Sequence, residues 1–196
     1  MVASNKNTLT IGVIAEEAND VDVLYEITRK LIRDCDFSFK PFLGHGCGKI
    51  RRKCKAWANN LVRRGCTHLV VMHDRDRWDV DELRTLLRDK LGEHSRDTTL
   101  VLIPVEELEA WLLSDPKAIM TAFRMRTEPK IKNNSEAIDS PKEYLKAIVQ
   151  RNSKTRYLNT VHNKKIAENL RLTSLRRCKS FRPYQAFLRS TRSDGT

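Results

Sequence analysis

Four short apolar runs alternate with amphipathic stretches along residues 9–123, and this alternation restricts the fold more than any other feature of the chain. The runs are rich in Val, Ile, Leu and Thr, which is typical of strands, and the stretches between them repeat apolar residues at helical spacing. Strands of near-continuous apolar character between helices indicate a parallel sheet covered on both faces. We therefore predict an α/β fold with strands at residues 9–15, 37–43, 68–73 and 98–105 and helices at 20–34, 49–64, 80–91 and 106–123.

Local signals refine this prediction and divide the chain into two parts. Asp20 is expected to cap the first helix, and Pro116 to break the fourth, since proline lacks a backbone N–H. The polar residues 124–141 are typical of a loop or linker. Short helices are expected beyond it, at 142–151, 163–171 and 183–190, and they are too small to form a core of their own. We predict an α/β body at residues 1–123 and a linker with a basic helical appendage at 124–196.

Positive charge is concentrated in two segments. The chain has a formal net charge of +12 and a pI near 9.7. Residues 151–196 hold twelve Lys and Arg against two Asp and Glu, a balance of +10, and residues 48–65 form a second basic cluster. This asymmetry favours a polyanionic partner, most simply nucleic acid, although a solvated surface without a specific partner is the alternative. The candidate phosphate contacts are Lys49, Arg51, Arg52, Lys164, Lys165, Arg176, Arg177 and Lys179.

Other residues indicate the cellular compartment that we expect and exclude some kinds of binding site. Five cysteines without a CxxC spacing favour reduced thiols over a disulfide framework or a structural zinc site. The chain shows neither a signal-peptide pattern nor an apolar run of the roughly 20 residues that cross a membrane, so we expect a cytoplasmic protein. The turn "GHGCGK" lacks the spacing of an ATP-binding P-loop. Three aromatic residues of the basic tail could stack on bases or form the core face of the last helix: Phe181, Tyr184 and Phe187.

Acidic residues gather where three of the predicted strands end. The carboxyl ends of parallel strands meet at one edge of a sheet, where ligands bind. Carboxylate oxygens prefer Mg²⁺ or Mn²⁺, and residues i and i+2 of an extended segment point the same way, so Asp74 and Asp76 can face one ion. His73, beside them, is a further candidate ligand or a locally bonded residue. The alternative is that the acids cap turns and helices. In chain order they are Glu16, Glu17, Asp20, Asp74, Asp76, Glu106, Glu107 and Glu109.

Three segments also carry a family resemblance. "VIAEEANDVDVL" places Glu16 after the first strand with Asp20 behind it, and "VVMHDRD" places Asp74 and Asp76 after the third. Both resemble the Glu and DxD motifs of the Toprim domain of topoisomerases, bacterial primases and OLD-type nucleases. "IPVEELEAWLLSDP" is similar to a segment of a small Toprim-like bacterial family linked to mobile elements or phage defence, which implies a functional role for Glu109. Glu17 stands where the Toprim pattern commonly has Gly.

The resemblance implies a Toprim-like Rossmannoid sheet and catalytic domain over residues 9–123. Glu16, Asp74 and Asp76 would hold Mg²⁺ or Mn²⁺, and Glu109, together with Glu106, would complete a second metal position or orient a water molecule. We expect a metal-dependent nuclease that hydrolyses DNA or RNA, acting as an effector in anti-phage defence. The alternative is a non-catalytic nucleic-acid-binding subunit that works with an ATPase partner in a defence complex.

Overall fold

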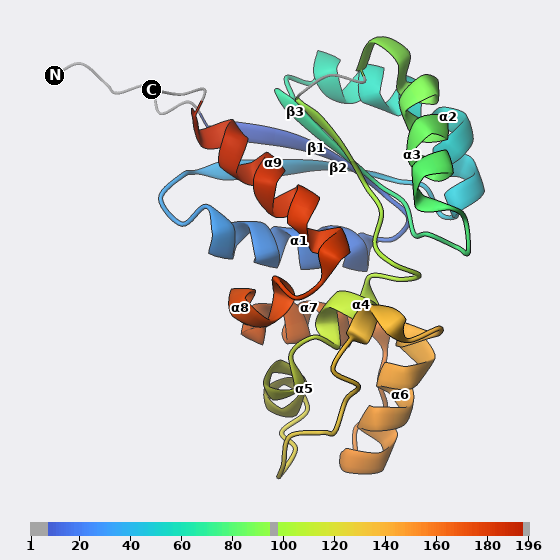
Figure 1. Ribbon diagram of the computed structural model, residues 1–196. Coiled ribbons are helices and arrows are strands. Elements are labelled where there is room, and N and C mark those ends of the chain that lie inside the picture. The colour runs from blue at the N-terminus through green and yellow to red at the C-terminus, as the bar shows by residue number, and fades with distance from the viewer. Residues whose placement is uncertain (1–7, 95–97, 194–196) are drawn as a thin grey trace, which may run out of the picture.

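A four-stranded parallel sheet organises the computed structural model, which describes residues 8–94 and 98–193 (Figure 1). β1 (Leu9–Ala15) lies between β2 (Phe37–Leu43) and β3 (His68–Met72), and β4 (Thr99–Leu102) forms the edge beyond β3. Every neighbouring pair of strands is parallel. The predicted α/β class is confirmed.

The strand order creates a switch point at the acidic end of the sheet. The chain leaves β1 for β2 on one side and then returns to β3 on the other side. In open α/β sheets, ligands bind at such a point, outside the carboxyl ends of the strands. Glu16 directly follows β1, and Asp74 and Asp76 lie in the loop that follows β3. The topology therefore brings together the two motifs on which the Toprim resemblance depends.

Helices cover both faces of the sheet (Figure 1). α2 (Cys47–Arg63) and α3 (Val80–Leu91), which is followed by the short turn η1 (Gly92–His94), share one hydrophobic cluster with Ile14 of β1. α1 (Ala18–Leu31) and α9 (Arg182–Ser193) share the other cluster with the remaining apolar residues of β1. The last helix therefore packs on the α/β body, and its buried Tyr184 and Phe187, like Phe181 just before it, belong to the core rather than to an exposed stacking surface.

The elements between β4 and α9 form a second lobe, which we define as residues 109–181 and which lies below the sheet in Figure 1. It contains α4, α5, α6, α7 and α8 with two single-turn helices, and it shares its core cluster with the sheet. Trp111 is fully buried there and donates its Nε1–H to Ser180 Oγ at 2.7 Å. The bounds are α4 (Glu109–Leu112), α5 (Pro116–Ala122), η2 (Ser135–Ala137), α6 (Pro141–Asn152), α7 (Asn159–Asn169), α8 (Leu172–Leu175) and η3 (Lys179–Phe181).

One sequence prediction about a helix break is confirmed, and one about a helix start was wrong. The expected helix at 106–123 is divided at Pro116 into α4 and α5, because Asp115 accepts the N–H of Ala118 and starts α5 with Pro116 in its first turn. The first helix begins at Ala18, so Glu17 is its N-cap residue and Asp20 lies one turn inside. Glu17 has a φ of −127°, an extended backbone that any residue adopts, so the position does not require the Gly of the Toprim pattern.

Charged side chains hold parts of the second lobe together and attach the lobe to α1. Asp115 is fully buried, and Arg171 binds it through the backbone N–H and through Nε, both at 2.9 Å, and through Nη2 at 2.5 Å. Lys30 of α1 donates from Nζ to three carbonyl oxygens at the end of α7, at 2.7 to 2.8 Å. A lysine at this position satisfies the carbonyls that a helix end leaves without partners. These contacts hold the end of α7 beside the end of α1.

Candidate metal centre

Five carboxylates converge at the switch point, and we call Glu16, Asp20, Asp74, Asp76 and Glu109 the carboxylate cluster. The loops after β1 and β3 supply Glu16, Asp74 and Asp76, while α1 supplies Asp20 and α4 supplies Glu109. Burial raises the pKa of Asp74 well above its ordinary value, and the charges of Asp20, Glu109, Glu16 and Asp76 raise it further. Asp74 therefore lies within the electrostatic reach of all four other members.

Asp74 is also the member of the cluster whose hydrogen bonding is incomplete. Its Oδ1 atom is shielded from solvent and has no hydrogen-bond partner in the described part of the chain. Leaving a buried acceptor without a donor costs about 1–3 kcal/mol. Either a proton or a bound cation removes this cost, and the surrounding negative charge favours both.

Asp20 combines a structural contact with a place in the cluster. Its Oδ2 accepts the backbone N–H of Glu17 at 2.9 Å, which caps the start of α1, and its Oδ1 accepts the Asn19 side chain at 3.2 Å. Burial raises the pKa of Asp20 to about 7; the bond from Glu17 opposes this, and the charge of Glu109 adds to it. Two neighbouring carboxyl groups, Asp20 and Asp74, are thus both held toward the protonated form in the metal-free protein.

Glu109, the first residue of the second lobe, is held there by two uncharged side chains. Its Oε1 accepts Asn163 Nδ2 at 3.0 Å and lies 3.2 Å from the hydroxyl of Tyr157, which is also 2.6 Å from Asn163 Oδ1. Glu109, Tyr157 and Asn163 are all buried. Burial raises the pKa of Tyr157, and the negative charge of Glu109 raises it further, so this hydroxyl stays a donor. The contacts fix one oxygen of Glu109 and leave its other oxygen for a ligand.

The second lobe makes one more contact with the acidic edge. Asn159, the first residue of α7, donates from Nδ2 to Glu17 Oε2 at 3.1 Å. The roles of Tyr157, Asn159 and Asn163 could not be predicted from the sequence, since no local motif distinguishes them from ordinary surface or core residues. Their role depends on where α7 packs, which is decided by contacts far away along the chain.

Cys47 and His73 border the cluster on the side of α2. Cys47 donates its thiol to Glu16 Oε2, with 2.8 Å between sulfur and oxygen. His73 Nδ1 lies 2.5 Å from the carbonyl oxygen of Asp74, and its Nε2 lies 3.0 Å from Arg51 Nη1. Since a guanidinium only donates, Nε2 is the acceptor and Nδ1 carries the proton. Burial lowers the pKa of His73, and Arg51 lowers it further, which favours this neutral form.

Left-handed backbone conformations mark the loops at this edge. His45, Asp76 and Glu106 follow β2, β3 and β4 respectively, and their φ angles are 49°, 47° and 57°. Non-glycine residues seldom adopt this region, and each such residue costs on the order of 1 kcal/mol that the surrounding structure must offset. Constrained loops thus carry the acidic residues after β3 and β4.

Glu106 and Glu107 bind other partners outside the carboxylate cluster. The Glu106 carboxylate, expected as a metal ligand, forms an ion pair with Arg75 at 3.3 Å. Glu107 Oε2 accepts the backbone N–H of Lys142 at 2.8 Å and so helps to cap α6. For these two residues the structure supports the alternative interpretation, in which acids stabilise loops and helix starts.

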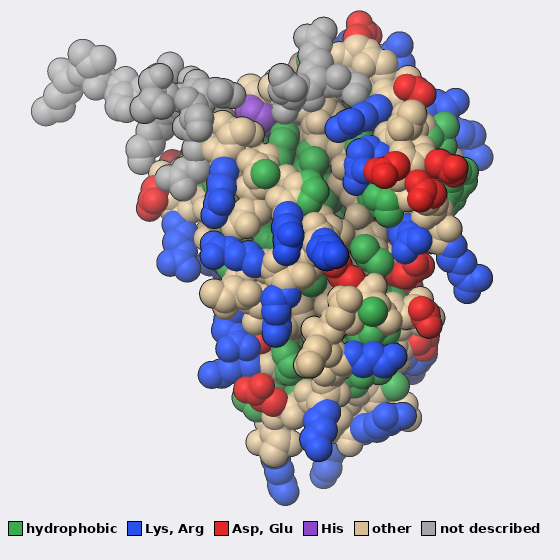
Figure 2. All heavy atoms as spheres, viewed as in Figure 1, with side chains coloured by type: hydrophobic (Ala, Val, Ile, Leu, Met, Phe, Trp, Pro, Cys, Tyr) green, Lys and Arg blue, Asp and Glu red, His purple; other side chains and the backbone are tan. Residues whose placement is uncertain are grey.

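The predicted phosphate contacts lie in different surroundings. Figure 2 shows Lys and Arg side chains over both lobes on one face of the molecule, with acidic side chains among them. Arg51 is half-buried and lies 5.4 Å from the centre of the Trp78 ring. Arg177 donates from Nη2 to the carbonyl of Ser114 at 2.5 Å, so it also has a structural contact. Lys164 is half-buried, and the exposed candidates are Lys49, Arg52, Lys165, Arg176, Arg177 and Lys179.

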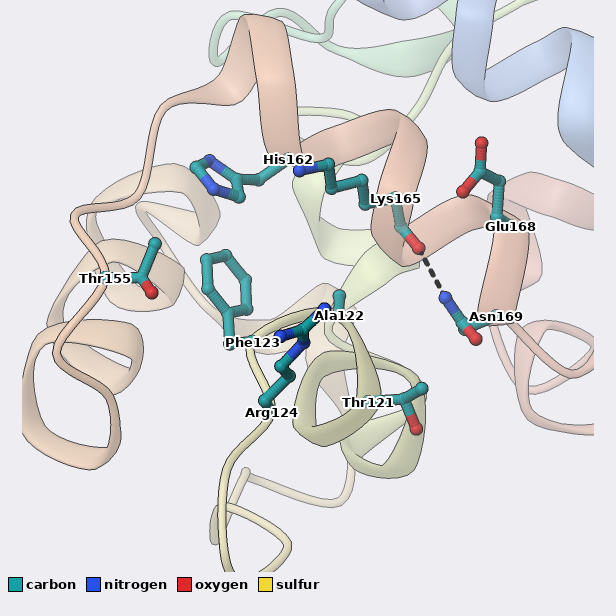
Figure 3. Close-up of a pocket in the computed structure, with 9 residues that line it drawn as sticks. All are labelled: Thr121, Ala122, Phe123, Arg124, Thr155, His162, Lys165, Glu168 and Asn169. Carbon is teal, nitrogen blue, oxygen red and sulfur yellow. Dashed lines mark hydrogen bonds between the residues drawn. The ribbon is translucent and has the colours of Figure 1, made fainter.

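A hollow of about 480 Å³ opens between α5 and α7 in the second lobe (Figure 3). Arg124 and Lys165 reach toward this space, and the stacked rings of Phe123 and His162 form part of its wall. Both rings also pack near Tyr157, at 6.4 and 6.2 Å between centroids. The hollow is therefore linked to Glu109 through Tyr157, but no member of the carboxylate cluster lines it.

Comparisons with known proteins give a family without an activity. The sequence model of one family, described as "Domain of unknown function (DUF4276)", matches residues 20–189. No curated protein and no solved structure matches the chain. The Toprim resemblance stays a prediction, because nothing in these comparisons tests it. Within residues 8–94 and 98–193, none of the helices has the length and apolar character needed to cross a membrane.

Proposed function

The chain belongs to the DUF4276 family, and we propose that it is a nuclease that hydrolyses phosphodiester bonds of DNA or RNA with Mg²⁺ or Mn²⁺ as its cofactor. The observation that carries this proposal is the Asp74 Oδ1 atom, which is shielded from solvent and lacks a hydrogen-bond partner within the described ranges. Burial raises the pKa of the same Asp74 carboxyl group, and the negative charges of four other carboxylates raise it further. A divalent cation would satisfy the oxygen and neutralise the repulsion, which a proton does only in part.

The donor set fits a hard cation. Carboxylate oxygens are the ligands that Mg²⁺ and Mn²⁺ prefer in proteins. We expect Asp74, Glu16 and Glu109 to hold the ion, with the exposed Asp76 at the open side of the cluster. The hydrogen bonds to Glu109 from the second lobe are contacts of the kind that orient metal ligands. Both oxygens of Asp20 already accept hydrogen bonds, so we assign it a supporting role.

The protein's own residues supply the contacts to a phosphodiester. A divalent ion in such a site polarises a phosphoryl oxygen and lowers the pKa of bound water. Arg51 has five N–H donors, and His73 accepts from one of them, so the others can bind the non-bridging oxygens of a phosphate. Lys49 and Arg52 are exposed on the same helix and extend this positive surface. The arrangement places cationic side chains beside an anionic centre, as binding and cleavage of a polyanion require.

A second candidate is a nucleic-acid-binding subunit without turnover, which works with an ATPase partner in anti-phage defence. The net charge of +12 favours this candidate as much as it favours a nuclease. The two candidates differ in whether the carboxylate cluster takes part in chemistry. Divalent-dependent cleavage separates them, whereas binding alone does not.

The test incubates the purified protein with labelled single-stranded DNA, duplex DNA and tRNA in Mg²⁺, Mn²⁺ or EDTA. We expect cleavage of at least one substrate with a divalent ion and none in EDTA. Asp74→Asn removes a charge and keeps the shape of the side chain, so it should abolish cleavage while the protein stays folded. Asp89→Asn is the matched control, because Asp89 is exposed on α3.

Each outcome of this test decides between the candidates. Calorimetric titration of Mn²⁺ should show weaker binding to Asp74→Asn than to wild type and to Asp89→Asn. Cleavage that persists in Asp74→Asn would remove Asp74 from the site. Binding of all three nucleic acids without cleavage in any metal would leave the binding-subunit candidate in its place.

A further inference from the structure

Beside the proposed carboxylate site, we infer that Cys47, His73 and Asp76 form a second site, for Zn²⁺ or a similar transition-metal ion, which shares Asp76 with the carboxylate cluster. The three residues come from the start of α2, the end of β3 and the loop after it, and one ligand atom of each lies within 4.8 Å of the other two. A sulfur, a nitrogen and an oxygen form a donor set that suits Zn²⁺ and Co²⁺ far better than Mg²⁺. The sequence indicated His73 and Asp76 as candidate ligands but not Cys47, which joins them only in the fold.

His73 already has the form that a metal ligand needs. Histidines that bind metals usually donate their second ring N–H to a carbonyl or carboxylate, which fixes the tautomer and the ring orientation. Nδ1 of His73 makes this contact with the Asp74 carbonyl at 2.5 Å. Its Nε2 therefore carries the free lone pair, on the side of the ring where Arg51 lies.

The guanidinium of Arg51 lies at the ring nitrogen of His73 to which a metal ion would bind. Its Nη1 lies 3.0 Å from Nε2, and its guanidinium lies 5.4 Å from the centre of the exposed Trp78 ring. A metal ion at Nε2 would displace the Arg51 contact, and the Trp78 face remains available to the guanidinium. Metal and Arg51 should therefore compete for the same lone pair.

Cys47 is the first residue of α2, a helix of 17 residues that has no acidic residue in its first turn. Burial raises the pKa of the Cys47 thiol, and the hydrogen bond to Glu16 raises it further, so the sulfur keeps its proton until a metal ion displaces it. In the metal-free protein the thiol donates to Glu16. Metal binding replaces the S–H bond with a metal–sulfur bond and releases the proton to solvent.

Asp76 completes the set from a constrained loop. Its φ of 47° and that of Arg77, 63°, turn the chain sharply after β3. The side chain is exposed, so a three-residue site here keeps an open position for water or substrate. Asp76 also contributes to the field at Asp74, so the two sites share one border.

Cobalt spectroscopy tests this site without reference to turnover. Titration of the metal-free protein with Co²⁺ alone should give a thiolate-to-cobalt charge-transfer band at one equivalent, and Zn²⁺ should remove the band by competition. Cys47→Ser should lose the band, whereas Cys54→Ser, a buried cysteine two turns along the same helix, should keep it. Absence of the band in wild type, or its presence in Cys47→Ser, would overturn the assignment.

Two variants keep the test decisive if Cys47→Ser folds poorly. Asp76→Asn changes an exposed residue, so it should fold; we expect it to keep the band and to raise the half-saturating Co²⁺ concentration by on the order of tenfold or more. Arg51→Ala should lower that concentration, because it frees Nε2 of His73. Unchanged affinity in both variants would contradict the site.

The zinc site and the proposed nuclease can fail separately. Asp74→Asn should abolish cleavage and retain the cobalt band. A protein that shows the band but never cleaves nucleic acid would keep the zinc site and lose the proposed function. Cleavage without the band would have the opposite meaning.

Discussion

The carboxyl edge of the sheet and the second lobe form two sides of the same centre, and they contribute different chemistry to it. The sheet edge supplies the charged groups Glu16 and Asp74, the latter in the loop where Asp76 has a left-handed backbone. The second lobe supplies one carboxylate, Glu109, together with the buried neutral groups Tyr157 and Asn163 that contact it. Most of the charge thus comes from one side, and the neutral groups that orient a ligand come from the other.

This difference predicts different defects for the two sides. Loss of a charged group at the sheet edge removes an interaction that acts on the reacting atoms, so it should reduce turnover. Loss of a neutral donor in the second lobe loosens a ligand without removing it, so it should first weaken metal binding. Four experiments, in order of decreasing effect, test the comparison.

The largest effect is expected at Glu16. Glu16→Gln keeps a carbonyl acceptor for the Cys47 thiol and removes only the charge, so turnover should fall by on the order of 10²–10³-fold. Affinity for nucleic acid should hold or rise, because a negative charge near the phosphates is gone. Single-turnover cleavage and fluorescence anisotropy measure the two quantities, with Glu82→Gln on α3 as the exposed control. Equal cleavage by Glu16→Gln and wild type would shift the assignment to Glu17.

A smaller effect is expected at Tyr157. Tyr157→Phe removes the hydroxyl near Glu109 and leaves the ring, so the Mg²⁺ concentration for half-maximal cleavage should rise by about 10–100-fold. The rate at saturating Mg²⁺ should change much less. Tyr144→Phe, in α6 of the same lobe, is the control. A fall in the saturated rate with unchanged metal dependence would mean that the second lobe acts on the chemistry itself.

The stability of the metal-free protein should depend on pH through Asp20. Its pKa is about 7 in the folded protein and 3.8 as the ordinary value, so the folded state binds more protons between these two values. The free energy of unfolding should therefore fall as the pH rises from about 4 to 7. Asp20→Asn cannot lose this proton and still offers an acceptor to the Glu17 N–H.

Urea denaturation in EDTA measures this effect. At pH 8, Asp20→Asn should be more stable than wild type by about 1–2 kcal/mol, a value reduced to allow for the partial exposure of Asp20. At pH 4 the difference should disappear. A variant that is less stable than wild type at both pH values would show that the cap at the start of α1 outweighs the repulsion in the cluster.

The smallest effect concerns the basic residues of the second lobe. Arg176 is exposed, whereas Arg177 also binds the Ser114 carbonyl. If Arg176 contacts a phosphate, Arg176→Ala should reduce the slope of log affinity against log salt by about 0.9 on duplex DNA. Arg177→Ala should instead lower the thermal midpoint. Identical salt slopes for Arg176→Ala and wild type would exclude the second lobe from the nucleic-acid surface at that position.

Much of the fold follows from local patterns in the chain. The apolar run at 9–15 and the spacing of apolar residues in the following helix predicted β1 and α1, because strand and helix periodicities are read over a few neighbouring residues. The same holds for the place of Glu16, Asp74 and Asp76 at one edge, since parallel strands share their carboxyl ends. Pro116 also predicted the break before α5. The start of α1 was harder to predict, because at Glu17 the capping contacts, not the apolar pattern, set the boundary.

The other half of the centre could not be predicted from the sequence. Tyr157 and Asn163 reach Glu109 because α7 packs beside α1 and α4, and Cys47 reaches His73 because α2 starts at the same edge where β3 ends. Such contacts join residues that are 26 to 54 positions apart, as with Cys47 and His73 or Asn163 and Glu109. Local sequence determines which acidic residues end which strand, because periodicity is a short-range property. Only the tertiary structure decides which neutral and sulfur-bearing groups face them, because packing between distant segments is set by the shape of the whole core.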